Sequence, residues 1–321
     1  MSIVRNIREH ASEYSRNPAV IDSDQTWSYG EFFDRVDRLS NAFLELGLHK
    51  GRVLLCWLPN VREALETELA CLQIGGIWVT LNAGLTWPEV ELVVRSTQPA
   101  VFVTDSSLLG RITPSSPEVK ADLSAATLFL RGDGIPSTLF ASRTGFENAI
   151  AGAPADVPRI DVDEADVARL RYTSGTTGNA KAAILSHRAY RGSLVNLREH
   201  LHQLGPSDRV LHAAPLTHAS AALSYPILAA GGASVIMPTF DAEKVLETIE
   251  SHRITTMFAV PTMLQRLAST PSFRTRDLSS IRTISYGGAP MPVTKIEPLI
   301  ERLGPVFMQI YGLTEALHPV T

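Results

Sequence analysis

Residues 172–181 read Tyr-Thr-Ser-Gly-Thr-Thr-Gly-Asn-Ala-Lys, a stretch dense in glycine and hydroxyl side chains that closes on Lys181. An apolar strand is expected just before it, over residues 167–172, and a helix is expected to open near Ser186. Glycine lets the backbone approach an anion, amides and hydroxyls donate hydrogen bonds, and the lysine adds positive charge. The stretch therefore predicts a phosphate-binding loop, with a solvated surface loop as the alternative.

Two common nucleotide-binding loops do not match this stretch. A Walker loop needs four residues between its glycines and a lysine directly after the second. Here Gly175 and Gly178 are too close together, and Lys181 stands three positions beyond Gly178. The spaced glycine triplet that opens the helix of a dinucleotide-binding fold is absent as well.

The composition is that of a globular protein. The 321 residues are 45% hydrophobic, enough for a sizeable core and about two domain-sized layers. A formal net charge of -4 disfavours binding to nucleic acid or an anionic membrane surface, and no apolar run reaches the length of a membrane span or signal peptide. Cys56 and Cys71 lie in expected core elements, which favours a cytoplasmic location, and the histidines lack metal-ligand spacing.

Short apolar strands alternate with amphipathic helices along the chain. Strands are expected at residues 52–58, 77–81, 100–104, 127–131, 167–172, 209–213, 234–237, 255–260, 282–285 and 306–311, and helices at 61–74, 88–95, 187–201, 241–252, 261–268 and 293–303. Asn60 is expected to cap the helix from residue 61, and Gly75 and Gly76 to end it. Residues 108–161 are rich in Pro, Gly and Ser and are expected to be irregular apart from strand 127–131. The alternation predicts an α/β protein with mostly parallel sheets covered on both faces.

The loop resembles the Thr/Ser/Gly-rich loop of the adenylate-forming (AMP-binding) superfamily, which includes acyl- and aryl-CoA ligases, luciferases and peptide-synthetase adenylation domains. The usual loop ends Gly-x-Pro-Lys-Gly, and this chain has Ala180 and Ala182 at the proline and final glycine positions. Residues 27–32 and 72–79 resemble two further family segments that carry no chemistry. Because the segments occur in the family's order, together they are more specific than any one of them.

The resemblance implies two stacked αβα layers within an incomplete N-terminal AMP-binding domain at residues 1–321. One layer would span about residues 52–204, and the other residues 1–51 plus 205–321. The ligand site is then expected in the crevice between the sheets, at the carboxyl ends of strands. Family members continue into a ribose-binding aspartate, a hinge and a C-terminal lid domain with a second catalytic lysine. Full turnover is therefore not expected of residues 1–321 alone.

The second family segment is residues 309–315, Gln-Ile-Tyr-Gly-Leu-Thr-Glu. By resemblance, Tyr311 stacks on adenine, Thr314 touches the α-phosphate and Glu315 holds Mg²⁺ together with Thr176. A flat ring accepts a base, and a carboxylate oxygen suits Mg²⁺. An ordinary strand end with a capping acid is the alternative. The ATP-binding residues implied by the loop and this segment are Thr173, Ser174, Gly175, Thr176, Thr177, Gly178, Lys181, Gln309, Ile310, Tyr311, Gly312 and Thr314.

Two more segments resemble family motifs around the ligands. Residues 285–292, Ser-Tyr-Gly-Gly-Ala-Pro-Met-Pro, would cover the adenine and also wall the acyl pocket, with a plain turn before a helix as the alternative. The ATP-binding residues of this segment are Gly288, Ala289 and Pro290, and the substrate-binding residue is Gly287.

Residues 214–224 resemble the Pro-Leu-Phe-His segment of acyl- and aryl-CoA ligases, with Thr217 where an aromatic residue is usual. By that match His218 lies near the substrate carboxylate, and Ser220 and Ser224 point along the acyl tunnel. The alternatives are a buried histidine bonded to backbone and serines on a helix surface.

The reaction implied by the resemblance is ATP-dependent activation of a carboxylic acid to an acyl-adenylate, with release of pyrophosphate. The acid is already ionised at neutral pH, so catalysis comes from alignment and charge neutralisation by Lys181, Thr314, Glu315 and Mg²⁺, with His218 at the acid. In the complete enzyme the acyl group would pass to coenzyme A, or to a carrier-protein thiol.

The substrate is predicted less sharply than the reaction. Residues 215–226 contain no acid that could pair with a substrate ammonium, which disfavours an amino acid. Small residues at 219–222 leave room for an apolar body, which favours a fatty or other hydrophobic acid, with an aryl acid as a close second. A nucleotide- or acyl-binding fragment without turnover is the rival interpretation.

Overall fold

The computed structural model describes residues 2–22, 25–133, 138–173, 181–201 and 203–317. The chain forms two compact units. The first comprises Met1–Asn6, Glu31–Pro59 and Glu63–Tyr190, and the second Ile7–Gly30, Asn60–Arg62 and Arg191–Thr321. These bounds differ from the expected layers, because Glu31–Pro59 belongs to the first unit and the residues from Arg191 to the second.

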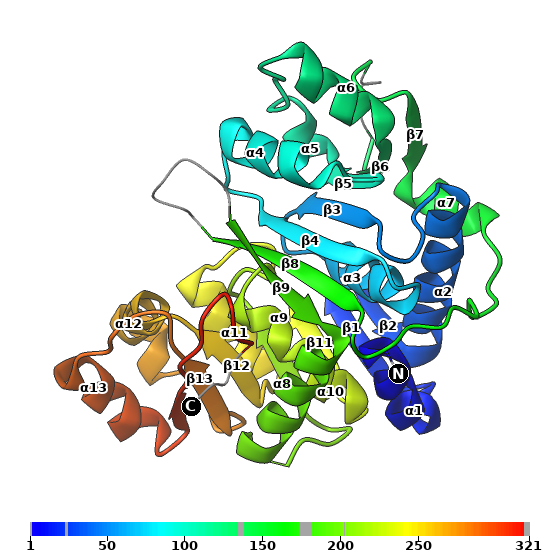
Figure 1. Cartoon of the computed structure of the whole chain (residues 1–321). Coiled ribbons are helices and arrows are strands. Elements are labelled where there is room, and N and C mark those ends of the chain that lie inside the picture. Colours follow the sequence, from blue (N-terminus) through cyan, green and yellow to red (C-terminus); the bar gives the residue numbers. More distant parts are fainter. Residues whose placement is uncertain (1, 23–24, 134–137, 174–180, 202, 318–321) are drawn as a thin grey trace. The chain divides into compact units, whose positions relative to one another are not determined.

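The first unit is built on a seven-stranded sheet (Figure 1). Its strands in spatial order are β7 (Ser142–Gly145), β6 (Thr127–Arg131), β5 (Val101–Asp105), β3 (Val53–Leu58), β4 (Ile77–Asn82), β8 (Val167–Thr173) and β9 (Lys181–Ser186). All neighbours run parallel except β8 and β9. The helices with most of their residues here are α2 (Tyr29–Glu45), α3 (Arg62–Gln73), α4 (Trp87–Thr97), α5 (Ser106–Leu109), α6 (Pro117–Ala125) and α7 (Phe146–Gly152).

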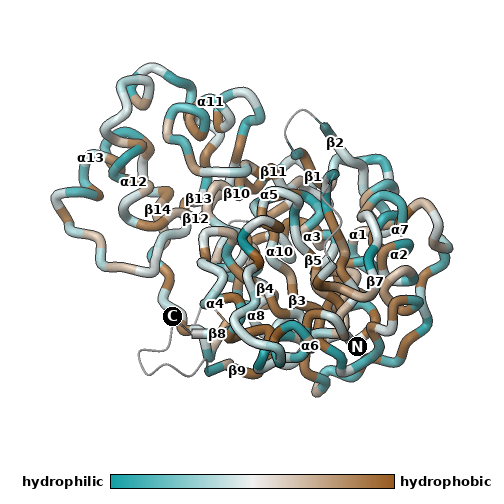
Figure 2. The backbone as a smooth tube through the Cα atoms, turned by 90° about the horizontal axis from the view of Figure 1, so that it is seen from above, coloured by the Kyte–Doolittle hydropathy of each residue, from teal (hydrophilic) through white to brown (hydrophobic). Residues whose placement is uncertain are grey.

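The core of this unit lies between the sheet and its helices. Trp57 of β3, Phe102 of β5, Val90 of α4 and Leu123 of α6 belong to one cluster of buried side chains. The tube through β3 is correspondingly brown in Figure 2. Strands buried on both faces read as continuous apolar runs, which is why their positions could be predicted from the sequence.

The second unit contains another seven-stranded sheet. Its order is β14 (Phe307–Gln309), β13 (Thr283–Tyr286), β12 (Thr256–Ala259), β10 (Arg209–His212), β11 (Ala233–Ile236), β1 (Pro18–Asp22) and β2 (Gln25–Ser28). Only β1 and β2 pair antiparallel. Its helices include α9 (Ala219–Ala222), α10 (Ser224–Ala229), α11 (Ala242–His252), α12 (Pro261–Ser269) and α13 (Val293–Leu303), with short 3₁₀ turns at Ser12–Tyr14 and Pro271–Arg274. α1 (Ile3–Ala11) and α8 (His187–His200) have residues in both units.

Two local expectations are wrong, and one strand was not expected. Helix α8 begins at His187, as expected, but strand β9 lies between it and the phosphate-loop stretch. Residues 108–161 contain α6, α7, β7 and the end of α5 besides the expected strand. Asn60 does not cap α3, because its carboxamide bonds to Ala214 and Leu216. The backbone N–H of Arg62 donates to the carboxylate of Asp22 at 2.9 Å and is satisfied there.

Candidate functional site

Strands β8 and β9 close the phosphate-loop stretch. Thr173 and Lys181 are register partners in this antiparallel pair, so the two ends of the stretch lie side by side. The backbone of Thr173 ends β8, and the side chain of Lys181 is exposed. Ser174, Gly175, Thr176, Thr177 and Gly178 lie outside the described residues, and their phosphate contacts therefore stay predictions.

The carboxyl end of β8 is tied to a neighbouring helix. The hydroxyls of Tyr172 and Ser96, the latter in α4, lie 2.5 Å apart. Tyr172 also packs against the buried cluster of the first unit. The strand that leads into the stretch is thus held by both a hydrogen bond and apolar contact.

Three of the four predicted motifs follow parallel strands of the second sheet. Residues 213–224 follow β10, residues 287–292 follow β13 and residues 310–315 follow β14. Because these strands are parallel, all three segments leave the sheet at the same edge. This is the edge at which open α/β sheets bind ligands.

Gly287 and Ile310 make a close backbone approach at this edge. Tyr286 pairs with Gln309 across β13 and β14, and the N–H of Ile310 donates to the oxygen of Tyr286 at 2.8 Å. A Cβ at Gly287 would lie 2.5 Å from the backbone oxygen of Ile310, which only glycine avoids. Gly288 follows at φ 82°, in the left-handed region that favours glycine. The structure thus brings together the segments of residues 285–292 and 309–315.

The segment after β14 presents its side chains outward. Tyr311 is 57% exposed, Glu315 is exposed and Thr314 is half-buried. Ala289 and Pro290 are exposed on the neighbouring segment. An exposed aromatic ring can stack on a flat base.

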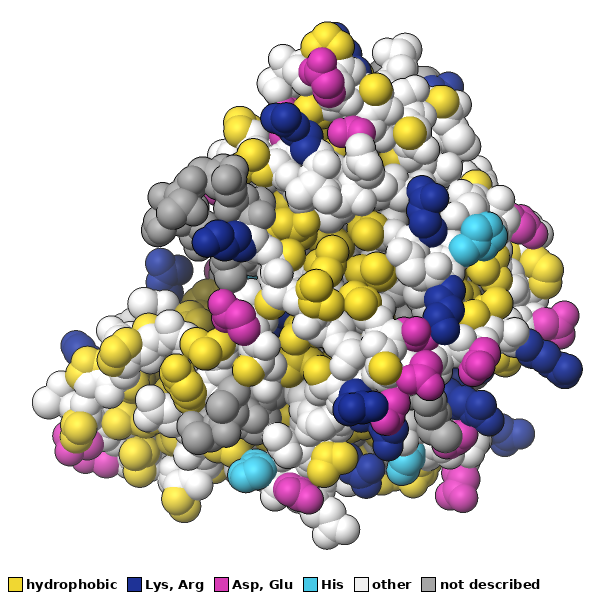
Figure 3. All heavy atoms as spheres, viewed as in Figure 1, with side chains coloured by type: hydrophobic (Ala, Val, Ile, Leu, Met, Phe, Trp, Pro, Cys, Tyr) yellow, Lys and Arg dark blue, Asp and Glu magenta, His cyan; other side chains and the backbone are white. Residues whose placement is uncertain are grey.

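Exposed apolar side chains also occur elsewhere on this unit. Figure 3 shows hydrophobic side chains scattered over the part of the surface where Figure 1 places α13. Val293 and Ile300 of that helix are 67% and 41% exposed. They lie outside the predicted motifs.

Glu315 fits the predicted metal role by its chemistry. In sites where Mg²⁺ bridges substrate phosphates, the protein typically supplies one or two carboxylates, and an exposed carboxylate is available here. Within the described ranges, no group of three His, Cys, Asp or Glu side chains is arranged to hold a metal ion.

In the segment of residues 214–224, the two serines do not point along an open tunnel as expected. His218 is exposed and precedes α9. Ser220 and Ser224 are buried, and both hydroxyls face the imidazole of His212, at 3.0 Å from Nδ1 and 3.3 Å from Nε2. Ser234 of β11 lies 3.2 Å from Nε2. Sequence reasoning missed His212, whose partners Ser220 and Ser224 lie in two separate short helices.

Burial keeps His212 neutral. The side chain has no exposed surface, and desolvation lowers its pKa from 6.5 to about 4, against a smaller opposing effect of the hydrogen bond with Ser220. A neutral imidazole has one donor and one acceptor, and serine hydroxyls can complement either tautomer. His212 therefore joins β10, β11, α9 and α10 without carrying charge.

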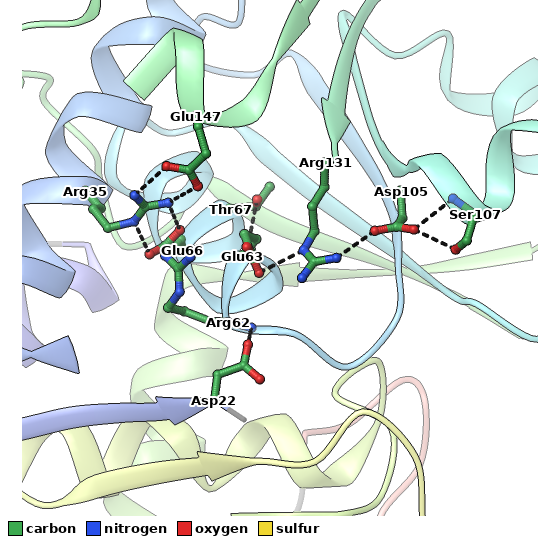
Figure 4. Close-up of polar contacts among 10 residues, drawn as sticks. All are labelled: Asp22, Arg35, Arg62, Glu63, Glu66, Thr67, Asp105, Ser107, Arg131 and Glu147. Atoms are coloured by element: carbon green, nitrogen blue, oxygen red, sulfur yellow. Dashed lines mark hydrogen bonds and ion pairs between the residues drawn. The ribbon is translucent and has the colours of Figure 1, made fainter. Parts of the chain in front are cut away.

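Charged side chains gather at the carboxyl edge of the first sheet (Figure 4). Arg35 of α2 contacts buried Glu66 at 2.7 Å and Glu147 at 2.7 Å. This pairing joins α2 to α3 and α7 in the first unit, and an unpaired buried Glu66 would be costly.

A second group surrounds Arg131. Its guanidinium lies 3.1 Å from Glu63 and 2.8 Å from Asp105. Burial alone would raise the pKa of Asp105, but hydrogen bonds from Ser107 and Arg131 outweigh it and lower the pKa.

A cavity of about 350 Å³ lies between these groups, lined by the ends of β6 and β7, the first turn of α7 and Glu63. None of the described lining residues was singled out from the sequence. Two of its acids, Glu63 and Glu147, pair with Arg131 and Arg35.

Comparison with known proteins decides the family. The model of the AMP-binding enzyme family matches residues 7–321. The chain belongs to the AMP-binding enzyme family. The fold has two mostly parallel sheets with flanking helices, which confirms the predicted α/β fold class.

Relatives of this AMP-binding chain include ligases named for aromatic acids. Feruloyl-CoA synthase of Amycolatopsis sp is 36% identical over 291 residues, covering 90% of this chain and 54% of the relative. Indoleacetate–CoA ligase of Aromatoleum aromaticum is 29% identical over 317 residues, covering 98% of this chain and 60% of the relative. The chain thus spans little more than half the length of these relatives.

A solved structure supports the same fold. The anthranilate CoA ligase AuaEII, crystallised in complex with anthranoyl-AMP, aligns with a TM-score of 0.89 and 22% identity, over 99% of this chain and 61% of that one. In the described part of this chain, no helix is long and apolar enough to cross a bilayer.

Proposed function

We propose that this chain is the nucleotide-binding part of an acid–thiol ligase that activates a carboxylic acid with ATP and releases pyrophosphate. The observation that carries the proposal is the close approach of Gly287 to the backbone of Ile310, the residue before the exposed Tyr311. Family membership supplies the reaction class.

In the proposed reaction, an oxygen of the acid bonds to the α-phosphorus of ATP while the bond to the pyrophosphate oxygen breaks. The carboxylate needs no general base, because it is ionised at neutral pH. Lys181 and the hydroxyls of Thr176 and Thr314 would neutralise and orient the phosphates, and Tyr311 would hold the adenine. Mg²⁺ held with Glu315 would supply further charge neutralisation when bound.

We propose an aromatic acid as the substrate. The sequence alone leaned towards a fatty acid, but two relatives are named for the aromatic acids ferulate and indoleacetate. His218 is exposed at the ligand edge of the second sheet, where it can approach a carboxylate. The absence of acids in residues 215–226 supports a substrate without an ammonium group.

Coenzyme A is the proposed acceptor of the acyl group, with a carrier-protein thiol as the alternative. A cytoplasmic location is also proposed. Both cysteines are free and buried, and burial raises the pKa of the Cys56 and Cys71 thiols, which keeps them unreactive. A module that binds nucleotide without turnover is the rival function.

Calorimetric titration with ATP and Mg²⁺ tests the nucleotide site through Tyr311. Base–aromatic stacking contributes about 1–3 kcal/mol, so Tyr311→Ala is expected to weaken ATP binding about tenfold. Tyr311→Phe keeps the ring and is the matched control, with affinity within about twofold of the wild type.

The titration separates the possibilities as follows. Equal ATP affinity in the folded Tyr311→Ala and wild-type proteins would remove Tyr311 from the site. Release of pyrophosphate on addition of ferulate to the complete enzyme supports the ligase, whereas ATP binding without any release supports the binding module.

A further inference from the structure

The segment that carries His218 has few regular hydrogen bonds of its own. It follows β10 and contains only the four-residue helix α9. Within it, the N–H of His218 donates to the oxygen of Pro215 at 3.2 Å. A turn of this kind depends on side chains from elsewhere for a fixed position.

Asn60 provides the first such contact. Its Nδ2 donates to the backbone oxygen of Ala214 at 3.0 Å, and its Oδ1 accepts from the backbone N–H of Leu216 at 2.9 Å. One carboxamide therefore supplies a donor and an acceptor to alternate residues, as a neighbouring strand would. Alanine would remove both bonds and serine could not span them.

His212 provides the second contact, behind the turn. Its imidazole meets the hydroxyls of Ser220 in α9 and Ser224 in α10, and is itself fixed by Ser234 of β11. Farther along, the hydroxyl of Tyr29 lies 2.7 Å from the oxygen of Gly232 and can donate to it. The helices after His218 are thus anchored to the sheet, and the turn before it to Asn60.

We propose that Asn60 is a positioning residue for acid binding: it holds the turn that places His218, while the His212 cluster fixes the helices behind that turn. The acid-binding part of this inference rests on the proposed function. The fixing of the turn by Asn60 is independent of the proposed function, because it follows from the two hydrogen bonds of the carboxamide.

Asn60→Ala tests the role, with Asn41→Ala as the matched control. Asn41 of α2 also donates from its carboxamide, to the backbone oxygens of Pro154 and Asp156 at 2.9 and 2.8 Å, but it lies in the first unit. Two measurements on the folded chains are compared. One is hydrogen exchange of a peptide covering residues 213–225, and the other is the pair of dissociation constants for ferulate and for Mg-ATP by calorimetry.

The expected result is faster exchange in this peptide and about tenfold weaker ferulate binding for Asn60→Ala, because small misplacements of a binding group are costly. The Mg-ATP affinity of Asn60→Ala should stay within about twofold of the wild type. Asn41→Ala should match the wild type in peptide exchange, ferulate affinity and Mg-ATP affinity. Unchanged exchange, or an equal loss of ferulate and ATP affinity, would overturn the positioning role. A wild-type chain that binds ATP but not ferulate would instead overturn the proposed aromatic-acid substrate, and with it the acid-binding part of the inference.

Discussion

His212 shows how one buried side chain links pH to the stability of the second unit. Its folded pKa is about 4, whereas an unfolded chain titrates near the ordinary 6.5. Below pH 6.5 the unfolded chain binds the proton and the folded chain does not, so folding stability is present above 6.5 and falls as pH drops towards 4. His187 of α8 lies in the first unit, and burial lowers its pKa to about 4 as well, so it adds a pH dependence in the same window.

We predict that His212→Gln flattens this pH dependence. For a single histidine with this shift, the free energy of unfolding should fall by about 2 kcal/mol from pH 7 to pH 5. Urea unfolding at both pH values measures the difference. Glutamine keeps one donor and one acceptor, so the variant should fold while losing this part of the slope.

The matched control is His49→Gln, which makes the same replacement at an exposed histidine. If His212→Gln and the wild type lost the same free energy between pH 7 and pH 5, His212 would not be the group that titrates.

The partners of single polar residues could not be predicted from the sequence. Asn60 stands at a position suited to a helix cap, yet its partners Ala214 and Leu216 are about 150 residues away. The partners of His212 come from α9, α10 and β11. Such pairings depend on tertiary structure, which residue type and local spacing do not encode.

At the scale of elements, apolar periodicity predicted most strands and long helices. The helix expected at 293–303 has those bounds, and β3 starts one residue later than expected. Strand β9 was missed because Lys-Ala-Ala-Ile-Leu-Ser contains two alanines and no clear alternation. The helices of residues 108–161 were missed because they are short and broken by Pro, Gly and Ser.

The family resemblance placed residues 285–292 and Tyr311 at the same adenine, but the backbone contact between the two segments was not predicted. Gly287 and Ile310 approach each other because β13 and β14 are neighbours in the sheet. The order of strands in the sheet cannot be predicted from the sequence of either segment. Gly287 therefore matters through the pairing of β13 with β14.

We predict that Gly287→Ala destabilises the second unit by about 1–3 kcal/mol, because its Cβ would meet the backbone oxygen of Ile310 rather than a flexible side chain. The same change should weaken ATP binding by displacing the segment of Tyr311. Thermal unfolding and calorimetry measure the two effects.

Gly192→Ala is the control for glycine replacement in this unit. It lies within α8, where a Cβ meets nothing within 4 Å, so alanine should stabilise the helix by about 0.5–1 kcal/mol. Wild-type stability and ATP affinity in Gly287→Ala would show that the backbone approach does not matter.

At the scale of the whole molecule, the chain covers 54% of feruloyl-CoA synthase and 60% of indoleacetate–CoA ligase. The residues proposed for adenine, phosphate and acid all occur within this portion, in segments that follow strands of the two sheets. We therefore propose that this portion by itself recognises the acyl-adenylate, even where turnover needs more of the protein.

A calorimetric titration with a non-hydrolysable sulfamoyl analogue of feruloyl-AMP tests this recognition, beside the matching dodecanoyl analogue. An analogue that fills the acid and AMP sites together should bind far more tightly than either ligand alone. We predict saturable binding of one feruloyl analogue per chain, at least about tenfold tighter than the dodecanoyl analogue. A folded chain that binds neither analogue would contradict the proposed adenylate site, and tighter binding of the dodecanoyl analogue would contradict the aromatic substrate.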